Sequence, residues 1–317
     1  MNRFWSRSIT RLRKTFVITG HHSYYESKAF EYAKLMMRPI KFFPAVLICL
    51  LISACSTKIA YNYLDWILEW YAEDLVSLDY DQEWQLRRAL AKELDWHRKK
   101  QLPLYVEGLD ELKQAIDNGL TVDSLQKIYV KQEQGLHKLL IQVAPSMAQL
   151  LATLSDKQVT QLLENLEDQN QDLEEEYVDK PREKLIEQRT ERMTDRVENW
   201  VGPLSDSQKQ MIEEWSSQIK PTATQWMANR RAWQEKLGLI LRENRSGTDF
   251  KERLEKLFTG SQKAWPESYR VDFEYNRELV FNFFVNLVNN LTTEQRQHLF
   301  DEIAVLRRQL TELHNQQ

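Results

Sequence analysis

Residues 291–313 read LTTEQRQHLFDEIAVLRRQLTEL, and they carry two separate signals of helical structure. Apolar residues recur at intervals of three and four, which is the spacing of one face of an α-helix. The opening pair, Thr292 and Gln295, matches a capping box, in which each side chain accepts a hydrogen bond from the main-chain N–H of the other residue. The segment therefore predicts an amphipathic helix that begins after Thr292. Its apolar face holds Leu299, Ile303, Leu306, Leu310 and Leu313.

The same opening recurs elsewhere in the chain. Leucine, serine and glutamine stand at the corresponding positions of residues 154–158 and 204–208, and a looser copy has Asp79 as the cap and Gln82 as its partner. The copies are unevenly spaced, so they do not form a solenoid repeat. We expect a helix to begin at each copy.

Helical spacing extends through nearly the whole chain. Between residues 59 and 313 no segment shows sustained alternation of apolar and polar residues. Glycine and proline number eight each, too few for the turns of a sheet-rich fold. The sequence therefore predicts an all-α protein, a multi-helix bundle in which residues 59–317 form a single domain. The core is expected to hold Trp70, Phe284, Leu287 and Leu306.

Residues 161–200 differ from the rest because they are strongly charged and their apolar stripe is narrow. A stripe this narrow cannot be buried on both sides, so we expect the two helices to project as a hairpin and to act as a partner-binding arm. No turn residues stand at the offsets of a calcium loop, which favours a solvated face over calcium binding. The candidate partner-binding residues are Glu164, Glu167, Asp168, Asp172, Glu174, Glu175 and Glu176.

The N-terminal region carries an export signal. Residues 42–52 are uncharged, too few to span a bilayer but as long as the apolar part of a signal peptide. Residues 52–55, Ile-Ser-Ala-Cys, resemble the lipobox of bacterial lipoproteins: an aliphatic residue, two small residues and the cysteine that receives diacylglycerol. The resemblance implies a signal peptide over residues 1–54, cleavage between Ala54 and Cys55, and acylation of Cys55.

Two further expectations follow from this resemblance. Residues 55–58 would form a short lipidated tether, and Ser56, in place of aspartate after the cysteine, implies sorting to the outer membrane. A signal of 54 residues is longer than usual, so translation from Met36 or Met37 is an alternative start.

Cleavage changes the charge of the chain. It removes nine basic and two acidic residues, which leaves 34 basic against 45 acidic residues and a net charge of −11. A surface this acidic disfavours nucleic acid and anionic headgroups as partners, so the lipid itself must hold the protein at the membrane. Cys49 leaves with the signal, and the mature chain is therefore expected to have no disulfide.

The segment 59–75 is predicted to be a strongly apolar helix, and two locations suit it. Because it starts about four residues after the acylated cysteine, it could lie on the membrane. Its narrow polar stripe is acidic, however, whereas helices on a membrane surface carry lysine and arginine there. We therefore expect this helix to pack in the core.

Other residues that suggest a ligand site have a plainer interpretation. Trp215, Trp226 and Trp233 fall on one helical stripe, which is either a ligand platform or, as we expect, part of the core. His97 is expected to face the core with its ring nitrogens hydrogen-bonded. The other histidines of the mature chain have no partner at metal-ligand spacing, so no metal or other cofactor is predicted.

Two resemblances bear on function. The lipobox, followed by residues 60–66 (AYNYLDW), by Leu78 and Asp79, and by residues 96–98 (WHR), resembles an uncharacterised family of Gram-negative lipoproteins with helical mature chains. That resemblance implies no known activity and no catalytic residue. The Leu-Ser/Thr-x-x-Gln copies are similar to the motif of small periplasmic stress chaperones, which implies a chaperone-like protein as an alternative.

These observations predict a lipid-anchored protein on the periplasmic face of the outer membrane. It would bind or scaffold an unidentified envelope protein without catalysing a reaction, and neither nucleic acid nor a small-molecule cofactor is expected as a partner. A peptidoglycan-acting enzyme is a second alternative, because many envelope lipoproteins use a glutamate acid. The sequence contains no nucleophile elbow and no His-Glu-x-x-His motif.

Overall fold

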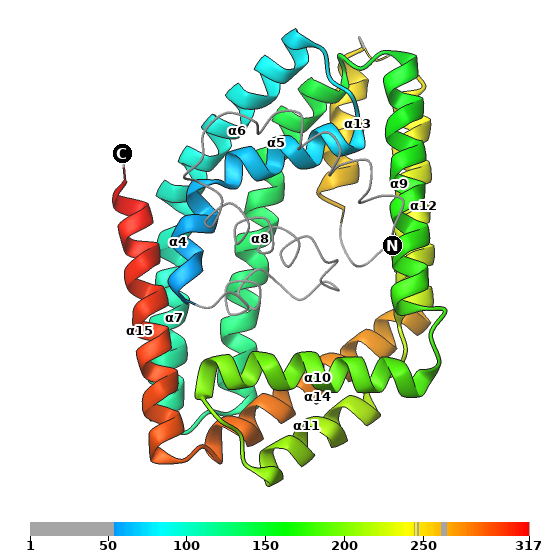
Figure 1. Cartoon of the computed structure of the whole chain (residues 1–317). Helices are drawn as coiled ribbons and strands as arrows, with labels where there is room; N and C mark the ends of the chain where they lie inside the picture. Colours follow the sequence, from blue (N-terminus) through cyan, green and yellow to red (C-terminus); the bar gives the residue numbers. More distant parts are fainter. Residues whose placement is uncertain (1–53, 244, 246, 261–264, 317) are drawn as a thin grey trace, which may run out of the picture. The chain divides into compact units, whose positions relative to one another are not determined.

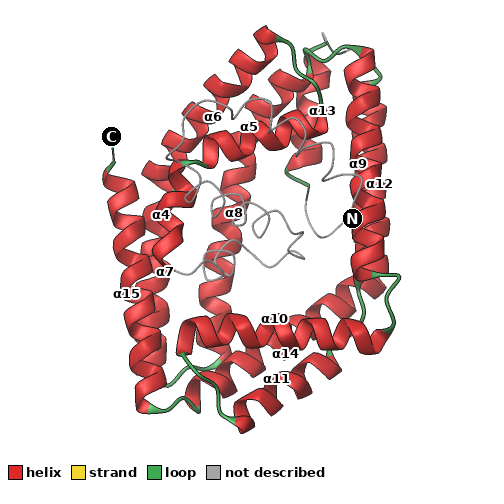
Figure 2. Ribbon diagram, in the orientation of Figure 1, coloured by secondary structure: helices red, strands yellow, loops and turns green. Residues whose placement is uncertain are grey.

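The computed structural model describes residues 54–316, apart from 244, 246 and 261–264, and all regular structure among these residues is α-helix (Figures 1 and 2). The all-α class predicted from the sequence is confirmed. The expected signal peptide lies outside the described residues, except for Ala54. In chain order the helices are α4 (Ala54–Asn62), α5 (Leu64–Leu75), α6 (Tyr80–Lys100), α7 (Leu102–Asp117), α8 (Val122–Leu151), α9 (Asp156–Tyr177), α10 (Arg182–Val201), α11 (Asp206–Gln218), α12 (Ala223–Leu241), α13 (Thr248–Phe258), α14 (Glu267–Asn289) and α15 (Thr293–Asn315).

Helices begin where the capping motif predicts. Asp79, Ser155, Ser205 and Thr292 are the N-caps of α6, α9, α11 and α15. Each cap side chain accepts from the main-chain N–H three residues on, and the glutamine at that position accepts from the main-chain N–H of the cap. A fifth box, with Thr121 as its cap, starts α8. These bonds satisfy N–H groups that have no partner within the helix.

The buried apolar side chains form three clusters. The largest joins α7, α10, α11, α14 and α15 and contains Leu287 and Leu306, as expected. The second joins α9, α12 and α13 to the C-terminal ends of α5 and α8, and the third is a small contact among α9, α12 and α14. Phe284 and Trp70, also expected in the core, are only partly buried.

The expectation that residues 161–200 project as a hairpin is wrong. α9 packs against α12 and α5, whereas α10 packs against α11 and α15 (Figure 1). Leu162, Leu166 and Leu173 of α9 are all buried. A narrow apolar stripe is thus enough to hold a helix against its neighbours, provided that polar contacts complete the interface.

Candidate functional site

α4 contains the predicted acylation segment and is fastened to the rest of the domain. Its first turn includes residues 54–56. Thr57 is buried, and Lys58 pairs with Glu312 of α15, with 2.6 Å between Nζ and Oε2. Residues 55–58, expected to form a tether, are therefore helical, and the last two of them are joined to the domain.

A histidine links α4 to α6 and α7. Nδ1 of His97 lies 2.9 Å from the hydroxyl of Tyr61, and Nε2 lies 3.4 Å from the hydroxyl of Tyr105. Burial, together with the adjacent Arg98 guanidinium, lowers the pKa of His97 to about 4, so the ring is neutral at neutral pH. A neutral imidazole has one donor and one acceptor nitrogen, which suits two hydroxyl partners. The expected hydrogen-bonded, core-facing histidine is confirmed.

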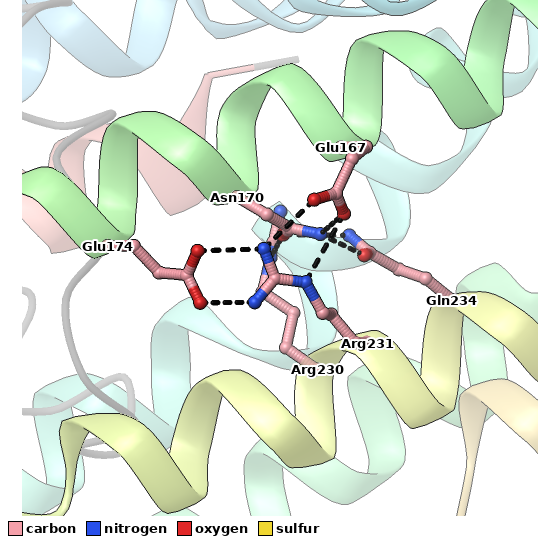
Figure 3. Close-up of polar contacts among 6 residues, drawn as sticks. All are labelled: Glu167, Asn170, Glu174, Arg230, Arg231 and Gln234. Carbon is pink, nitrogen blue, oxygen red and sulfur yellow. Dashed lines mark hydrogen bonds and ion pairs between the residues drawn. The ribbon is translucent and has the colours of Figure 1, made fainter. Parts of the chain in front are cut away.

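One arginine of α12 holds the acidic helix α9. Nη2 of Arg231 lies 2.9 Å from Oε1 of Glu167 and 2.9 Å from Oε2 of Glu174, and Nη1 also donates to Glu174 (Figure 3). These hydrogen bonds lower the pKa values of both carboxyl groups and raise the pKa of the guanidinium. Two of the seven predicted partner-binding residues, Glu167 and Glu174, are therefore already paired with an arginine of the same chain.

A buried amide completes the contact between α9 and α12. Asn170 is fully buried, and its Nδ2 donates to Gln234 over 2.6 Å and to Glu167 over 2.8 Å. Its Oδ1 accepts from Nε of Arg230 over 2.7 Å (Figure 3). A buried amide without partners costs about 1–3 kcal/mol, so these bonds select one alignment of the two helices. Asn170 is not among the residues predicted from the sequence, although a polar residue within the apolar stripe of α9 is the signal that could have found it.

Four of the remaining acidic residues of α9 face solvent. Glu164, Asp168, Asp172 and Glu175 are exposed, and at steps of four, four and three residues they lie along one side of the helix. We call these four residues the acidic row. Glu176 is partly exposed and lies outside it.

The capping glutamines meet in pairs that join two helix starts. Where α11 and α15 begin, Nε2 of Gln208 lies 2.8 Å from Oε1 of Gln295, and Nε2 of Gln295 lies 2.9 Å from Oε1 of Gln208. Gln208 also donates to the carbonyl of Asn290 over 3.4 Å, and Gln295 donates to that of Pro203 over 2.7 Å. Since each Oε1 also accepts from its own cap N–H, both amides use their full hydrogen-bonding capacity.

α6 and α9 begin at a second junction of the same form. Nε2 of Gln158 lies 2.6 Å from Oε1 of Gln82, and the return bond measures 3.3 Å. Gln82 also donates to the carbonyl of Thr153 over 2.9 Å, and Gln158 donates to that of Ser77 over 2.8 Å. The four motif copies thus form two matched pairs, and helix capping and packing account for their recurrence.

A buried carboxylate that the sequence did not predict lies between α6 and α8. Oε1 of Glu93 accepts from Ser146 over 2.6 Å, and Oε2 accepts from Gln142 over 2.8 Å. Burial raises the pKa of Glu93, but these two bonds and one from Lys92 outweigh burial, so the pKa is lowered overall. A general acid needs the opposite shift, so Glu93 is suited to a structural role.

The three tryptophans pack in the apolar clusters, as expected, but they lie on two helices and in three separate clusters and do not form one stripe. Trp215 and Trp226 are buried, and partly buried Trp233 donates from Nε1 to the carbonyl of Leu257 over 3.1 Å. Within the part of the chain that the structure describes, no three metal-binding side chains gather. A search of the same residues finds no helix with the length and apolarity needed to cross a bilayer.

Comparison with known proteins identifies a family. No curated protein and no solved structure matches the chain. A family model matches residues 74–270, from the C-terminal end of α5 to the first turn of α14. The match includes the acidic row and the arginine that holds α9, and it spans more than half of the sequence. The chain therefore belongs to DUF6279, a family of unknown function.

Proposed function

We propose that this chain is a lipid-anchored protein on the periplasmic face of the outer membrane, where it binds or scaffolds another envelope protein without catalysing a reaction. The lipobox supports cleavage after Ala54 and acylation of Cys55, and Ser56 supports sorting to the outer membrane. The ion pair between Lys58 and Glu312 supports an anchor that is joined firmly to the domain.

The observation that carries the binding function is the acidic row. Its four carboxylates are aligned on a helix whose other side is held by Arg231 and by the buried amide of Asn170. Because the helix that carries these side chains is already folded and packed, binding a partner costs no ordering of its main chain. A line of negative charge attracts a surface rich in lysine and arginine. The partner that fits the acidic row is therefore a basic surface of an envelope protein.

Charge reversal of the acidic row should abolish capture of this partner. The variant combines Glu164→Lys, Asp168→Lys, Asp172→Lys and Glu175→Lys. Exposed positions tolerate substitution within about 0.5 kcal/mol each, so α9 should keep its place. Crosslinking in cells, affinity purification and mass spectrometry should recover the partner with the wild-type protein and lose it with the variant.

A matched control reverses four exposed acidic side chains on α10 and α11. It combines Glu183→Lys, Glu191→Lys, Asp195→Lys and Glu213→Lys, so the net charge changes by the same amount. The control should retain the partner. Equal loss of the partner from both variants would show that total charge matters and would remove the acidic row as the binding site.

Cys55→Ala should leave the protein unprocessed, because the thiol that receives the lipid is absent. Mass spectrometry of the wild-type protein extracted from membranes should show a chain that begins at an acylated Cys55. An unmodified Cys55 in the mature wild-type chain would contradict the anchor.

Density fractionation of cells that express the wild-type protein should place it with outer-membrane markers. Co-migration with inner-membrane markers alone would contradict the sorting assignment.

A chaperone-like protein is the second candidate. Exposed aromatic side chains such as Tyr80 and Trp84 favour it, since unfolded clients bind apolar surface. In that case the purified protein would suppress aggregation of an unfolded client, and the acidic-row variant would do so equally well.

A peptidoglycan-acting enzyme is less well supported. The buried carboxylate of Glu93 has a lowered pKa, whereas a general acid needs a raised one.

A further inference from the structure

We infer that α4 and the start of α5 lie flat in the headgroup layer of the bilayer that anchors the protein, with Ile59, Tyr63 and Trp66 as the side chains that enter it. The inference rests on the acylation of Cys55 proposed above. We call these three residues the exposed stripe.

The first support is exposure. Ile59 is 49% exposed, Tyr63 54% and Trp66 45%, whereas Ile67 is the buried residue of α5. The expectation that this segment packs in the core is therefore wrong for five of its ten large apolar side chains. Seven of the thirteen exposed large apolar side chains in the described part of the chain lie within 26 consecutive residues that begin at Ile59, four positions after Cys55: Ile59, Tyr63, Trp66, Leu68, Tyr71, Tyr80 and Trp84.

The second support is the register of the helix. The helix is interrupted at Tyr63, whose φ of −107° and ψ of 11° are not helical, and a main-chain hydrogen bond from Tyr63 to Ile59 (3.3 Å) keeps Tyr63 on the last turn of α4. At about 100° per residue, positions 55, 59 and 63 fall within an arc of about 80°. Position 55, Ile59 and Tyr63 thus share one face of α4, and Trp66 follows on the first turn of α5.

The opposite face of α4 is fastened to the domain. Thr57 is buried, and Tyr61 reaches His97, so these two side chains turn toward the protein. The two positions lie roughly 200–240° around the helix from position 55. One face of α4 is therefore fixed inward, and the exposed side chains of Ile59 and Tyr63 lie on the other side.

The third support is distance. α4 contains residue 55, so no flexible tether separates the acylated position from the domain. The headgroup layer on each side of a bilayer is about 5–8 Å thick. Ile59 lies about 6 Å along α4 from position 55, and Tyr63 lies about 12 Å along it. If α4 stood upright, Tyr63 would leave this layer, whereas α4 lying along the surface keeps Ile59 and Tyr63 within it.

The chemistry of the stripe fits the headgroup layer. Tyrosine and tryptophan have an apolar ring and a polar group, and they are enriched where a membrane meets water. The stripe carries no charge, and Glu69, on the next turn of α5, pairs with Arg87 over 2.6 Å. Contact should therefore depend on the rings and not on anionic lipids, so it should persist at high salt.

Spin labels can test this contact in the acylated full-length protein. Cys55 is acylated and Cys49 is removed with the signal, so an introduced cysteine is the only free thiol. Labels at Tyr63→Cys and Trp66→Cys are compared with labels at Leu239→Cys and Val271→Cys, two apolar positions that are 56% and 55% exposed. In vesicles of neutral phospholipid, the ratio of oxygen to nickel-complex collision rates should be several-fold higher at the stripe than at the two control positions.

Mass spectrometry of each labelled protein separates the possible outcomes. Ratios at positions 63 and 66 equal to the control ratios, in a protein with acylated Cys55, would overturn the membrane contact and leave the anchor intact. Labels shielded from both reagents would mean that protein covers the stripe, which also overturns the contact. An unmodified Cys55 would overturn the proposed anchor, and this inference with it.

Discussion

Gln295→Ala should lower the free energy of unfolding by about 3 kcal/mol, because it removes one half of a saturated pair of buried amides. The variant leaves three polar groups without their partner: the side chain of Gln208, the carbonyl of Pro203 and the cap N–H of Thr292. The amide of Gln208 is buried, so the loss of its partner costs about 1–3 kcal/mol, and the two main-chain groups belong to exposed residues and cost less. Urea denaturation followed by circular dichroism measures the change.

Two further variants make this result specific. Gln297→Ala removes an exposed glutamine two residues further along α15, and it should change stability by less than about 0.5 kcal/mol. The double variant Gln208→Ala with Gln295→Ala should lose less stability than the sum of the losses of the two single variants, by about 1–3 kcal/mol. The reason is that each single variant leaves the other buried amide without its partner, whereas the double variant leaves no such amide. Strict additivity would show that the two glutamines act separately, as ordinary helix caps.

The capping boxes show how far the sequence predicts this fold. Each box is local, because its two bonds join residues three apart, and all four helix starts are where the motif places them. The pairing of Gln82 with Gln158 and of Gln208 with Gln295 joins residues 76 and 87 positions apart. The spacing of apolar residues along the sequence does not indicate which glutamines will pair. The two junctions can therefore be identified only in the folded structure.

The acidic helix and the first helices show why other expectations were wrong. The sequence predicted that the charged side chains of α9 face solvent. It could not indicate their pairing with Arg231, because this arginine is 57 residues from Glu174 and 64 from Glu167. In α5, apolar residues occur nearly all round the helix, so spacing alone could not determine which face is buried. In the structure that face contains Ile67, and Trp66 beside it is exposed.

Acid should weaken the protein through His97. Its pKa is about 4 in the folded chain, against an ordinary value of 6.5, because burial and Arg98 disfavour the charged ring. The neutral ring is therefore favoured by folding, and its full contribution is present above pH 6.5. As the pH falls from 6.5 towards 4, the unfolded chain binds a proton that the folded chain does not, and stability drops by about 3 kcal/mol.

A variant that cannot bind this proton isolates the effect of His97 from that of the carboxylates, which also titrate in acid. His97→Gln keeps a hydrogen-bonding side chain beside Tyr61 and does not ionise. Between pH 6.5 and 4, its free energy of unfolding should fall by about 3 kcal/mol less than that of the wild-type protein, because one proton fewer is taken up on unfolding. Urea denaturation at a series of pH values measures both curves. Parallel curves would mean that the ring is protonated as readily in the folded chain as in the unfolded one, and that the link between Tyr61 and Tyr105 does not depend on a neutral histidine.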